Sequence, residues 1–337
     1  MKIVVDAMGG DNAPGVEVEG AVAAVKSYKD ITVVLTGKKD AIEAVLASKK
    51  LTQSQRARLE VVHAGDVVTM SDSPAQAYKQ KPDSSLVVGA RLIKEGKADA
   101  FISAGNTGAV TVTSLLMIGR IPGVLRPGIL VPFPNKNGLT SIIDAGANVD
   151  CKPVHLVQFA VMGDLYARHI SGIENPRVGV LSVGEEDEKG NELSTATREL
   201  MAKTTLNFIG NVEGRDVTNG EVDVITCDGF VGNVILKHGE GVGDYLMGFM
   251  KSRIKKNPIA MLGALLLIPI FNKLKKEVDP NEYGGAPLLG VKKPVIITHG
   301  SIKSKGIKKA IKVASQFINK HINEQIESEI KKFGGAG

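Results

Sequence analysis

Residues 3–36 have the sequence IVVDAMGGDNAPGVEVEGAVAAVKSYKDITVVLT, and this stretch decides the fold. A β-branched run at Ile3–Asp6 leads into a Gly-rich turn, then a stretch of helical period at Val16–Tyr28, then a second apolar run at Ile31–Thr36. Such a unit is typical of two parallel strands joined by a crossover helix. It predicts an α/β fold in which the turn Gly9–Asn12 lies at the carboxyl end of a strand.

The alternation of short apolar runs and helical stretches continues along the chain. Continuous apolar runs are typical of strands buried on both faces, so we expect a three-layer, doubly wound, mostly parallel α/β sheet. Residues 1–337 are predicted to form one unit, and the Gly- and Pro-rich stretch 120–137 is the candidate crossing between two lobes. Further strands are predicted at 59–63, 98–103, 141–144, 177–183, 222–227 and 294–298, and further helices at 107–118, 153–170, 194–203, 231–250 and 307–330.

Composition limits the class of protein. The 337 residues are 43% hydrophobic, which is enough for a full core. The two cysteines show no metal-ligand spacing, and the N-terminus has no signal segment, so a reduced cytoplasmic protein is expected. A net charge of +6 favours acidic partners. Nucleic acid is not expected among them, because Trp is absent, aromatics make up 4%, and no nucleic-acid motif is found.

Six predicted strand ends carry Gly together with small polar residues. Glycine lets the backbone approach a ligand, and amides at a helix N-terminus face anions. We therefore predict that these loops gather into a phosphate or acyl-phosphate site; the alternative is ordinary turn chemistry at each strand end. The loops are Asp6–Asn12, Ser103–Gly108, Asp144–Asn148, Val183–Glu186, Asp228–Asn233 and His299–Ser301.

Known signatures for other chemistry are missing. The chain has no GxxxxGK[ST], no GxGxxG after the first strand and no HExxH, so no nucleotide cofactor or metal is predicted. It has no GxSxG elbow either, which favours direct attack over an acyl-enzyme intermediate. His299, beside Gly300 and Ser301 at a strand end, is a candidate donor to phosphate or to a carbonyl oxygen.

One segment resembles a surface anchor. Residues 251–276, KSRIKKNPIAMLGALLLIPIFNKLKK, contain seven basic residues and no acidic one around a 14-residue apolar run. This run is too short to span a bilayer but suits the surface of an anionic membrane. The alternative is a helix pair buried in a dimer interface. Residues 245–280 are predicted to protrude as a helical hairpin, with membrane or partner contacts at Lys251, Arg253, Lys255, Lys256, Leu262, Leu265 and Leu266.

Over essentially its whole length the chain resembles the phosphate acyltransferase (PlsX) family. The motifs that carry the resemblance are VDAMGGDNAP at 5–14, ISAGNTGA at 102–109, DAGANVDCKPVHL at 144–156, GNELS at 190–194, FIGNVEGRD at 208–216, CDGFVGNVILK at 227–237 and YGGAPLLG at 283–290. The segment 228–237 is also similar to one in phosphotransacetylases. The chain departs from the expected pattern at Ile302, where a small hydroxyl residue would be expected.

The resemblance implies an acyl-carrier-protein:phosphate transacylase that is homodimeric and peripherally bound to the membrane. A membrane glycerol-3-phosphate acyltransferase would use its product, acyl-phosphate, in phospholipid synthesis. The fold would be similar to those of phosphotransacetylase and of isocitrate and isopropylmalate dehydrogenases. Two other functions stay open, a short-chain phosphotransacetylase that uses coenzyme A and a non-catalytic membrane scaffold of lipid synthesis.

Inorganic phosphate is already anionic, so the site must mainly position it and stabilise charge. Lys189 and Asn233 are expected to stabilise the thioester oxygen, with His299 as a further catalytic candidate. The residues expected to hold phosphate are Gly9, Gly10, Asp11, Gly105, Asn106, Thr107, Ser301 and Lys305. Those expected to orient the loops are Asp6, Asp144, Asn148 and Asp228.

Overall fold

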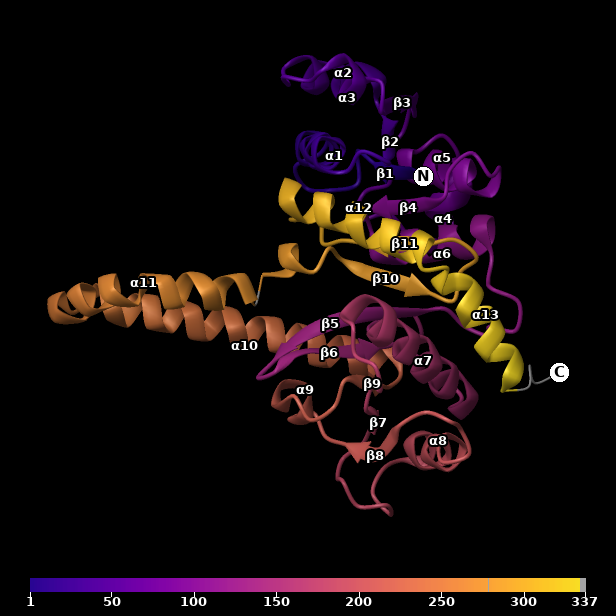
Figure 1. Cartoon of the computed structure of the whole chain (residues 1–337), viewed down its shortest axis with the longest axis vertical. Coiled ribbons are helices and arrows are strands. Elements are labelled where there is room, and N and C mark those ends of the chain that lie inside the picture. Colours follow the sequence, from indigo (N-terminus) through magenta and orange to yellow (C-terminus); the bar gives the residue numbers. More distant parts are fainter. Residues whose placement is uncertain (278, 334–337) are drawn as a thin grey trace.

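The computed structural model describes residues 1–277 and 279–333. One eleven-stranded sheet runs through the molecule in the order β3-β2-β1-β4-β11-β10-β5-β6-β9-β7-β8. Helices cover both of its faces (Figure 1). The predicted three-layer, mostly parallel α/β fold is confirmed.

The opening unit forms as its sequence predicts. β1 (Lys2–Asp6) and β2 (Thr32–Gly37) pair in parallel, and α1 (Gly15–Ser27) joins them. The first half of the sheet is completed by β3 (Leu59–His63), β4 (Ala100–Ser103) and β11 (Val295–Ile297), all parallel to β1.

The direction of the strands reverses in the middle of the sheet. β10 (Ala286–Leu289) is antiparallel to both β11 and β5 (Gly128–Asn135), and β5 is antiparallel to β6 (Gly138–Ile143). The second half then continues in parallel with β6. Its strands are β9 (Val224–Thr226), β7 (Val178–Leu181) and β8 (Phe208–Val212).

Two layers of helices bury the sheet. One hydrophobic cluster packs α1, α7 (Pro153–Tyr166), α12 (Ser304–Asn319) and α13 (Ile322–Lys332) on one face. A second cluster packs α5 (Ser85–Lys94) and α6 (Thr107–Thr113) on the other face. The shorter segments are α2 (Lys39–Ala47), α3 (Gln53–Arg56), α4 (Pro74–Gln80), η1 (Ser114–Ile118), η2 (Ala167–Ser171), α8 (Glu192–Met201), α9 (Asp216–Asn219) and η3 (Pro280–Glu282).

The structure differs from the predicted elements in several places. The predicted helix 307–330 is two helices, because His321 lies in the left-handed region at φ 50° and ends the run between α12 and α13. The break lets Ile322, Ile326 and Ile330 of α13 bury fully. Elements that the sequence did not predict are β5, β8, β10, α2, α3, α4, α5 and α9.

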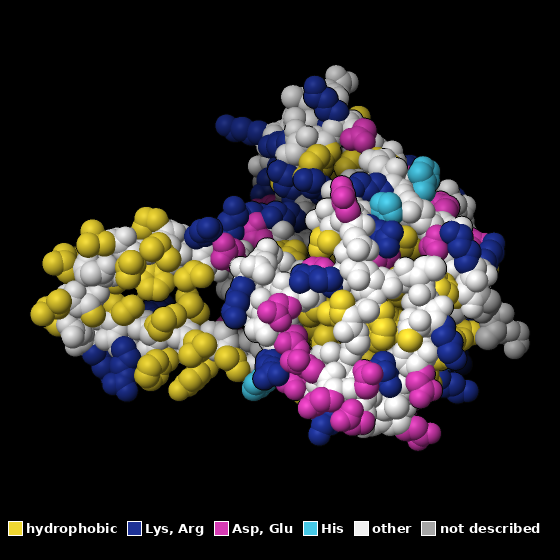
Figure 2. All heavy atoms as spheres, turned by 60° about the horizontal axis from the view of Figure 1, so that its bottom comes forward, with side chains coloured by type: hydrophobic (Ala, Val, Ile, Leu, Met, Phe, Trp, Pro, Cys, Tyr) yellow, Lys and Arg dark blue, Asp and Glu magenta, His cyan; other side chains and the backbone are white. Residues whose placement is uncertain are grey.

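A long helical hairpin projects from the body of the molecule (Figure 1). It consists of α10 (Gly229–Lys255) and α11 (Pro258–Glu277). Figure 2 shows hydrophobic side chains spread over this arm, with Lys and Arg side chains beside them. Leu262, Leu265 and Leu266 are 68%, 61% and 82% exposed. None of the helices within residues 1–277 and 279–333 combines the length and the apolar character needed to cross a bilayer.

The packing of α1 on α12 depends on a small residue at position 20. A Cβ atom added at Gly20 would lie 2.5 Å from Ile307 Cβ, whereas one added at Gly15 would meet open space. We expect Gly20→Ala to lower the free energy of unfolding by about 1–2 kcal/mol, because overpacking outweighs the gain in helix propensity. Gly15→Ala, on the same helix, should change it by less than about 0.5 kcal/mol. Equal urea midpoints for the two variants would contradict this account.

Candidate active site

The structure does not bring all six Gly-rich loops together. The loops that follow β1, β4 and β11 form one set, which we call the first loop group: residues 6–11, 103–107 and 299–301. Those that follow β6, β7 and β9 form the second loop group: residues 144–148, 182–191 and 227–233. The two groups leave the sheet in opposite directions, because the strands that precede them run in opposite directions. β4 and β6 are four strand positions apart, or about 19 Å.

In the first loop group, Asp6 joins the ends of β1 and β4. Its Oδ2 accepts a hydrogen bond from Ser103 Oγ at 2.8 Å, and its Oδ1 accepts one from the Met8 amide at 3.1 Å. Ser103 Oγ in turn accepts the Gly105 amide at 3.1 Å. Burial raises the pKa of Asp6 above its ordinary value, although the hydrogen bonds oppose the shift. The geometry agrees with a loop-orienting role for this carboxyl.

Backbone segments approach closely in this group. A Cβ atom at Gly9 would lie 2.7 Å from the Gly105 nitrogen and 2.8 Å from Asp6 Oδ2, so only glycine fits there. The Asp11 amide donates to the Gly300 carbonyl oxygen at 2.8 Å, which adds the loop after β11. The backbones of three loops from distant parts of the sequence therefore lie close together. Closely spaced backbone N–H groups are a common way to bind an oxyanion.

His299 and Ser301 form a local pair. The Ser301 amide donates to His299 Nδ1 at 3.1 Å, and Ser301 Oγ lies 2.8 Å from the same nitrogen. Because Nδ1 accepts a backbone N–H, the neutral ring carries its proton on Nε2. Both residues are exposed. His299 can therefore offer an Nε2–H donor to an anion or to a carbonyl oxygen.

Two residues predicted to hold phosphate are engaged elsewhere. Asn106 caps α6 by accepting the Ala109 amide at 3.0 Å, and its Nδ2 donates to the Met70 carbonyl at 3.1 Å. Lys305 forms an ion pair with Glu282, and this pairing contributes to a Glu282 pKa of about 2. Thr107 is exposed at the start of α6. Asn106 and Thr107 can thus serve an anion through their backbone amides, whereas the Lys305 side chain is held by η3.

Glu17 is not among the site residues that the sequence predicts. This residue of α1 is 1% exposed, and neither carboxylate oxygen has a hydrogen-bond partner within the described ranges. Its Oε1 lies directly under Gly10, where any Cβ atom would collide with it. Burial raises the pKa of Glu17 to about 7. The nearby backbone amides of Glu17 and Gly10 oppose this shift, and the charges of Asp6 and Asp11 add to it. At the sequence level Glu17 has the pattern of an ordinary first-turn acidic residue, so no signal marked it.

Glu17 should make stability depend on pH. The unfolded carboxyl has a pKa near 4.5 and the folded one a pKa near 7, so the folded state binds more protons between these values. The Glu17 contribution to stability is therefore lost as pH rises through this window. We expect Glu17→Gln to gain about 2–3 kcal/mol in free energy of unfolding relative to the wild type between pH 5 and pH 8, measured by urea denaturation.

The control is Glu19→Gln. Glu19 lies on the same helix, is exposed and pairs with Lys49 at 2.7 Å, so its substitution should show little pH dependence over this range. If the free energy of unfolding of Glu17→Gln differed from that of the wild type by the same amount at pH 5 and at pH 8, the Glu17 carboxyl could not have the raised pKa described above.

In the second loop group, Asp144 organises the turn after β6. It accepts the backbone amides of Ile129 at 3.0 Å, Gly146 at 3.1 Å, Ala147 at 3.0 Å and Asn148 at 2.7 Å. Asn148 Nδ2 adds a fifth bond at 2.8 Å. Burial raises the pKa of Asp144, and these donors oppose the shift. All five of these bonds hold the turn itself; a loop-orienting role for Asp144 and Asn148 stays a prediction.

Lys189 and Asn233 also lie in the second loop group. Asn233 is exposed on α10 beside Gly146, whose hypothetical Cβ would be 3.6 Å from Asn233 Cβ. Lys189 is exposed after β7, and its carbonyl oxygen accepts Asn211 Nδ2 at 3.2 Å. Neither side chain makes a hydrogen bond or ion pair to another described residue. Asp228 caps α10 by accepting the Val231 amide at 2.9 Å.

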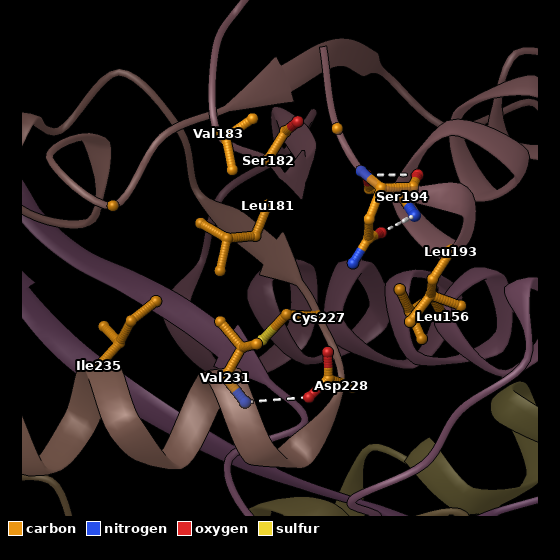
Figure 3. A pocket seen from close by; sticks show the side chains of 13 residues that line it. Leu156, Leu181, Ser182, Val183, Leu193, Ser194, Cys227, Asp228, Val231 and Ile235 are labelled. Carbon is orange, nitrogen blue, oxygen red and sulfur yellow. Dashed lines mark hydrogen bonds between the residues drawn. The ribbon is translucent and has the colours of Figure 1, made fainter.

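A pocket of about 290 Å³, which we call the β7/β9 pocket, opens beside this group. Figure 3 shows side chains from β7 and α10 pointing into the same space, with the Asp228–Val231 bond at its edge. No local sequence pattern marks this pocket, because its lining comes from separate segments. The lining residues are Leu156, Leu181, Ser182, Val183, Gly190, Asn191, Leu193, Ser194, Gly214, Cys227, Asp228, Val231 and Ile235.

No three His, Cys, Asp or Glu side chains are grouped as metal ligands in the part of the chain that the structure describes. The thiols are not poised for reaction either. Burial raises the pKa of Cys151 to about 12, and it raises that of Cys227 well above its usual value.

Solved structures share this fold. A phosphotransacetylase from Streptococcus pyogenes matches with a TM-score of 0.62 and 17% identity, over 95% of this chain and 94% of that one. The EutD phosphotransacetylase from Staphylococcus aureus matches with a TM-score of 0.58 and 15% identity, over 94% of each chain. The architecture is therefore that of the phosphotransacetylase class of α/β proteins.

Sequence similarity shows the family as well as the fold. A family model described as fatty acid synthesis protein matches residues 1–325. A phosphate acyltransferase from Halothermothrix orenii is 48% identical over 99% of this chain and 100% of its own length. One from Aquifex aeolicus is 50% identical over 98% and 97%. The chain belongs to the phosphate acyltransferase family.

Proposed function

We propose that this protein transfers a long-chain fatty acyl group from the thioester of acyl carrier protein to inorganic phosphate. The products would be acyl-phosphate, for phospholipid synthesis, and the free carrier thiol. The observation that carries the proposal is 48% identity to a phosphate acyltransferase over essentially both full lengths. The first loop group supports it, because closely packed backbones at strand ends suit a small oxyanion.

The reaction needs no enzyme-linked intermediate. An oxygen of hydrogen phosphate attacks the thioester carbonyl carbon, the new C–O bond forms, and the C–S bond breaks. The sulfur leaves with the electron pair and takes up the proton released by phosphate, so atoms and charge balance. Because phosphate is already anionic, the protein chiefly holds the reactants at near-attack distance and stabilises the charge that develops on the carbonyl oxygen.

Each loop group would take one part of this task. Phosphate would bind at the first group, to the amides of Gly9, Gly10, Asn106 and Thr107, with His299 Nε2–H and the Ser301 hydroxyl as further donors, because the Asp11 and Gly105 amides already donate to Gly300 and Ser103. Lys189 and Asn233 of the second group would stabilise the thioester oxygen. The acidic carrier protein would dock on basic residues around Lys251–Lys256, at the end of α10 where the arm turns into α11.

The two groups are too far apart in one chain to touch the same reacting atoms, which must approach within about 3–3.5 Å. We therefore place the reaction in a homodimer, where the second copy supplies the second loop group. An exposed apolar face supports an interface along α10, because Val242, Tyr245 and Phe249 are 40%, 66% and 46% exposed.

Activity is tested with purified protein, palmitoyl carrier protein and phosphate, by following the ³¹P signal of acyl-phosphate together with free thiol. We expect both products to appear only with phosphate. Asn233→Ala should lower turnover about 10²–10³-fold, as loss of an oxyanion donor does. Asn175→Ala, a substitution of an exposed asparagine after η2, should not. Turnover with acetyl-CoA but not with palmitoyl carrier protein would favour a short-chain phosphotransacetylase instead.

Mixing two inactive variants tests the shared site. His299→Ala and Asn233→Ala chains are co-expressed with different tags, and the heterodimers are purified. Each heterodimer should contain one intact site and one site that lacks both side chains. An unsorted mixture should then regain about a quarter of the wild-type rate. If both groups act within one chain, the mixture stays as inactive as its components.

The arm would hold the protein at the cytoplasmic face of the membrane, near the glycerol-3-phosphate acyltransferase that uses acyl-phosphate. Its apolar residues and its cations at Lys251, Arg253, Lys255 and Lys256 suit an anionic surface. Changing Lys251, Lys255 and Lys256 to Glu should weaken binding to anionic vesicles about 100-fold or more in flotation, since each cation contributes about 1 kcal/mol.

The charge control changes three exposed lysines far from the arm to Glu. Lys26, Lys29 and Lys50 give the same change in net charge. Equal loss of vesicle binding in both triple variants would show that net charge, and not the arm, brings the protein to the membrane.

A further inference from the structure

The β7/β9 pocket has a buried apolar floor and an exposed apolar rim. Leu156 and Cys227 in its floor are 2% and 4% exposed, whereas Val231 and Val183 at its rim are 36% and 80% exposed. An apolar group that enters the pocket would therefore contact aliphatic side chains both at the rim and in the floor. The pocket therefore faces outward and is shaped to receive an apolar group from solution.

Polar side chains around the pocket are already committed to the protein. Asn191 Oδ1 accepts the Ser194 amide at 2.9 Å, and Ser194 Oγ accepts the Asn191 amide at 3.0 Å. Asp228 caps α10 through the Val231 amide. Ser182 Oγ is the exception, since it is buried without a partner inside residues 1–277 and 279–333. The pocket thus offers a mainly aliphatic surface, with the Ser182 hydroxyl, the Asn191 amide nitrogen and the Asp228 carboxylate as its polar groups, which suits an alkyl chain more than an anionic ligand.

The space suits a long chain. A cavity of about 150 Å³ holds one benzene, so the 290 Å³ pocket has room for roughly twelve carbon atoms. A second, shallower hollow of about 340 Å³ adjoins it and shares Leu193, Asp228 and Val231 with it. Val149 and Phe230 line this second hollow and are 63% and 61% exposed. A chain longer than the pocket can continue past Val231 over this surface.

The pocket also lies next to Lys189 and Asn233, the two residues proposed to stabilise the thioester oxygen. Its wall residue Gly190 directly follows Lys189, and its wall residues Asp228 and Val231 precede Asn233 in the first turns of α10. The apolar run of the arm is the other candidate for chain binding. Its leucines are largely exposed, up to 82% at Leu266, and none of them lines either hollow.

We propose that the β7/β9 pocket binds the alkyl chain of the acyl donor, and that the chain passes into the adjoining hollow at Val231. This assignment rests on the proposed function. In this assignment the pocket determines which acyl chain lengths the protein prefers, and the arm remains free to contact the membrane surface.

The test is Val231→Phe, which adds bulk at the junction of the two hollows without entering the buried core. Binding of cis-parinaric acid, a fluorescent 18-carbon fatty acid, is measured directly and by displacement with palmitate and octanoate. We expect Val231→Phe to weaken binding of the probe and of palmitate at least about 10-fold and to change octanoate binding less than about 3-fold. Turnover of palmitoyl carrier protein should fall more than that of octanoyl carrier protein.

Val234→Phe is the matched control. It makes the same change three residues along α10, at a valine that is 52% exposed and lines neither hollow. It should leave probe binding unchanged. Wild-type probe affinity in a folded Val231→Phe protein would overturn the proposal, and so would loss of binding in Leu266→Asp on the arm. Because the probe is read without turnover, an enzyme that binds it but makes no acyl-phosphate would refute the proposed function and leave this pocket assignment standing.

Discussion

The antiparallel pairing of β5 with β6 at the centre of the sheet reverses the strand direction from one half to the other, because β10 is antiparallel to both β11 and β5 and therefore leaves those two strands parallel to each other. Loops leave a parallel sheet at the carboxyl ends of its strands, so this single reversal sends Gly9–Asp11 and Asp144–Asn148 in opposite directions. Had β6 been parallel to β5, all of these loops would lie along one edge. The division into a group suited to an oxyanion and a group beside an apolar pocket follows from the antiparallel pairing of these two strands.

Within each group, a buried carboxylate fixes the loop by accepting backbone N–H groups. Asp144 accepts four amides and a side-chain donor, and Asp6 links two strand ends through Met8 and Ser103. Charge-assisted bonds of this kind are stronger than neutral ones and hold a loop without any contribution from a ligand. Such loops are already ordered without substrate, so no conformational entropy of the loops is lost when substrate binds.

The sequence was sufficient for the fold class, because its long apolar runs and Gly-rich turns repeat with the period of βα units. β1, α1 and β2 form close to where Ile3–Asp6, Val16–Tyr28 and Ile31–Thr36 predict them. The strands that the sequence missed contain residues that normally interrupt strands. β5 includes Pro132 and Pro134, and β10 includes Pro287.

The candidate site could be predicted only in part. Aspartates at strand ends, such as Asp6 and Asp144, can be predicted from the sequence, because Asp in that position often caps the following helix. Strand order and direction decide which loops meet, and these depend on pairings between residues far apart in the sequence, such as Leu288 with Ile129. Glu17 and the β7/β9 pocket were missed for the same reason, since each is defined by tertiary neighbours rather than by a local pattern.

The helix α10 starts at the Asp228 cap and continues without interruption for 27 residues, or about 40 Å. A continuous helix transmits axial displacement and rotation along its length, whereas a loop would absorb them. Any load on the far end of the arm would therefore reach the first turn, where Val231 borders the pocket and Asn233 lies beside the turn after β6. The turn that borders the pocket and the arm that projects from the body are thus parts of one helix, with no loop between them.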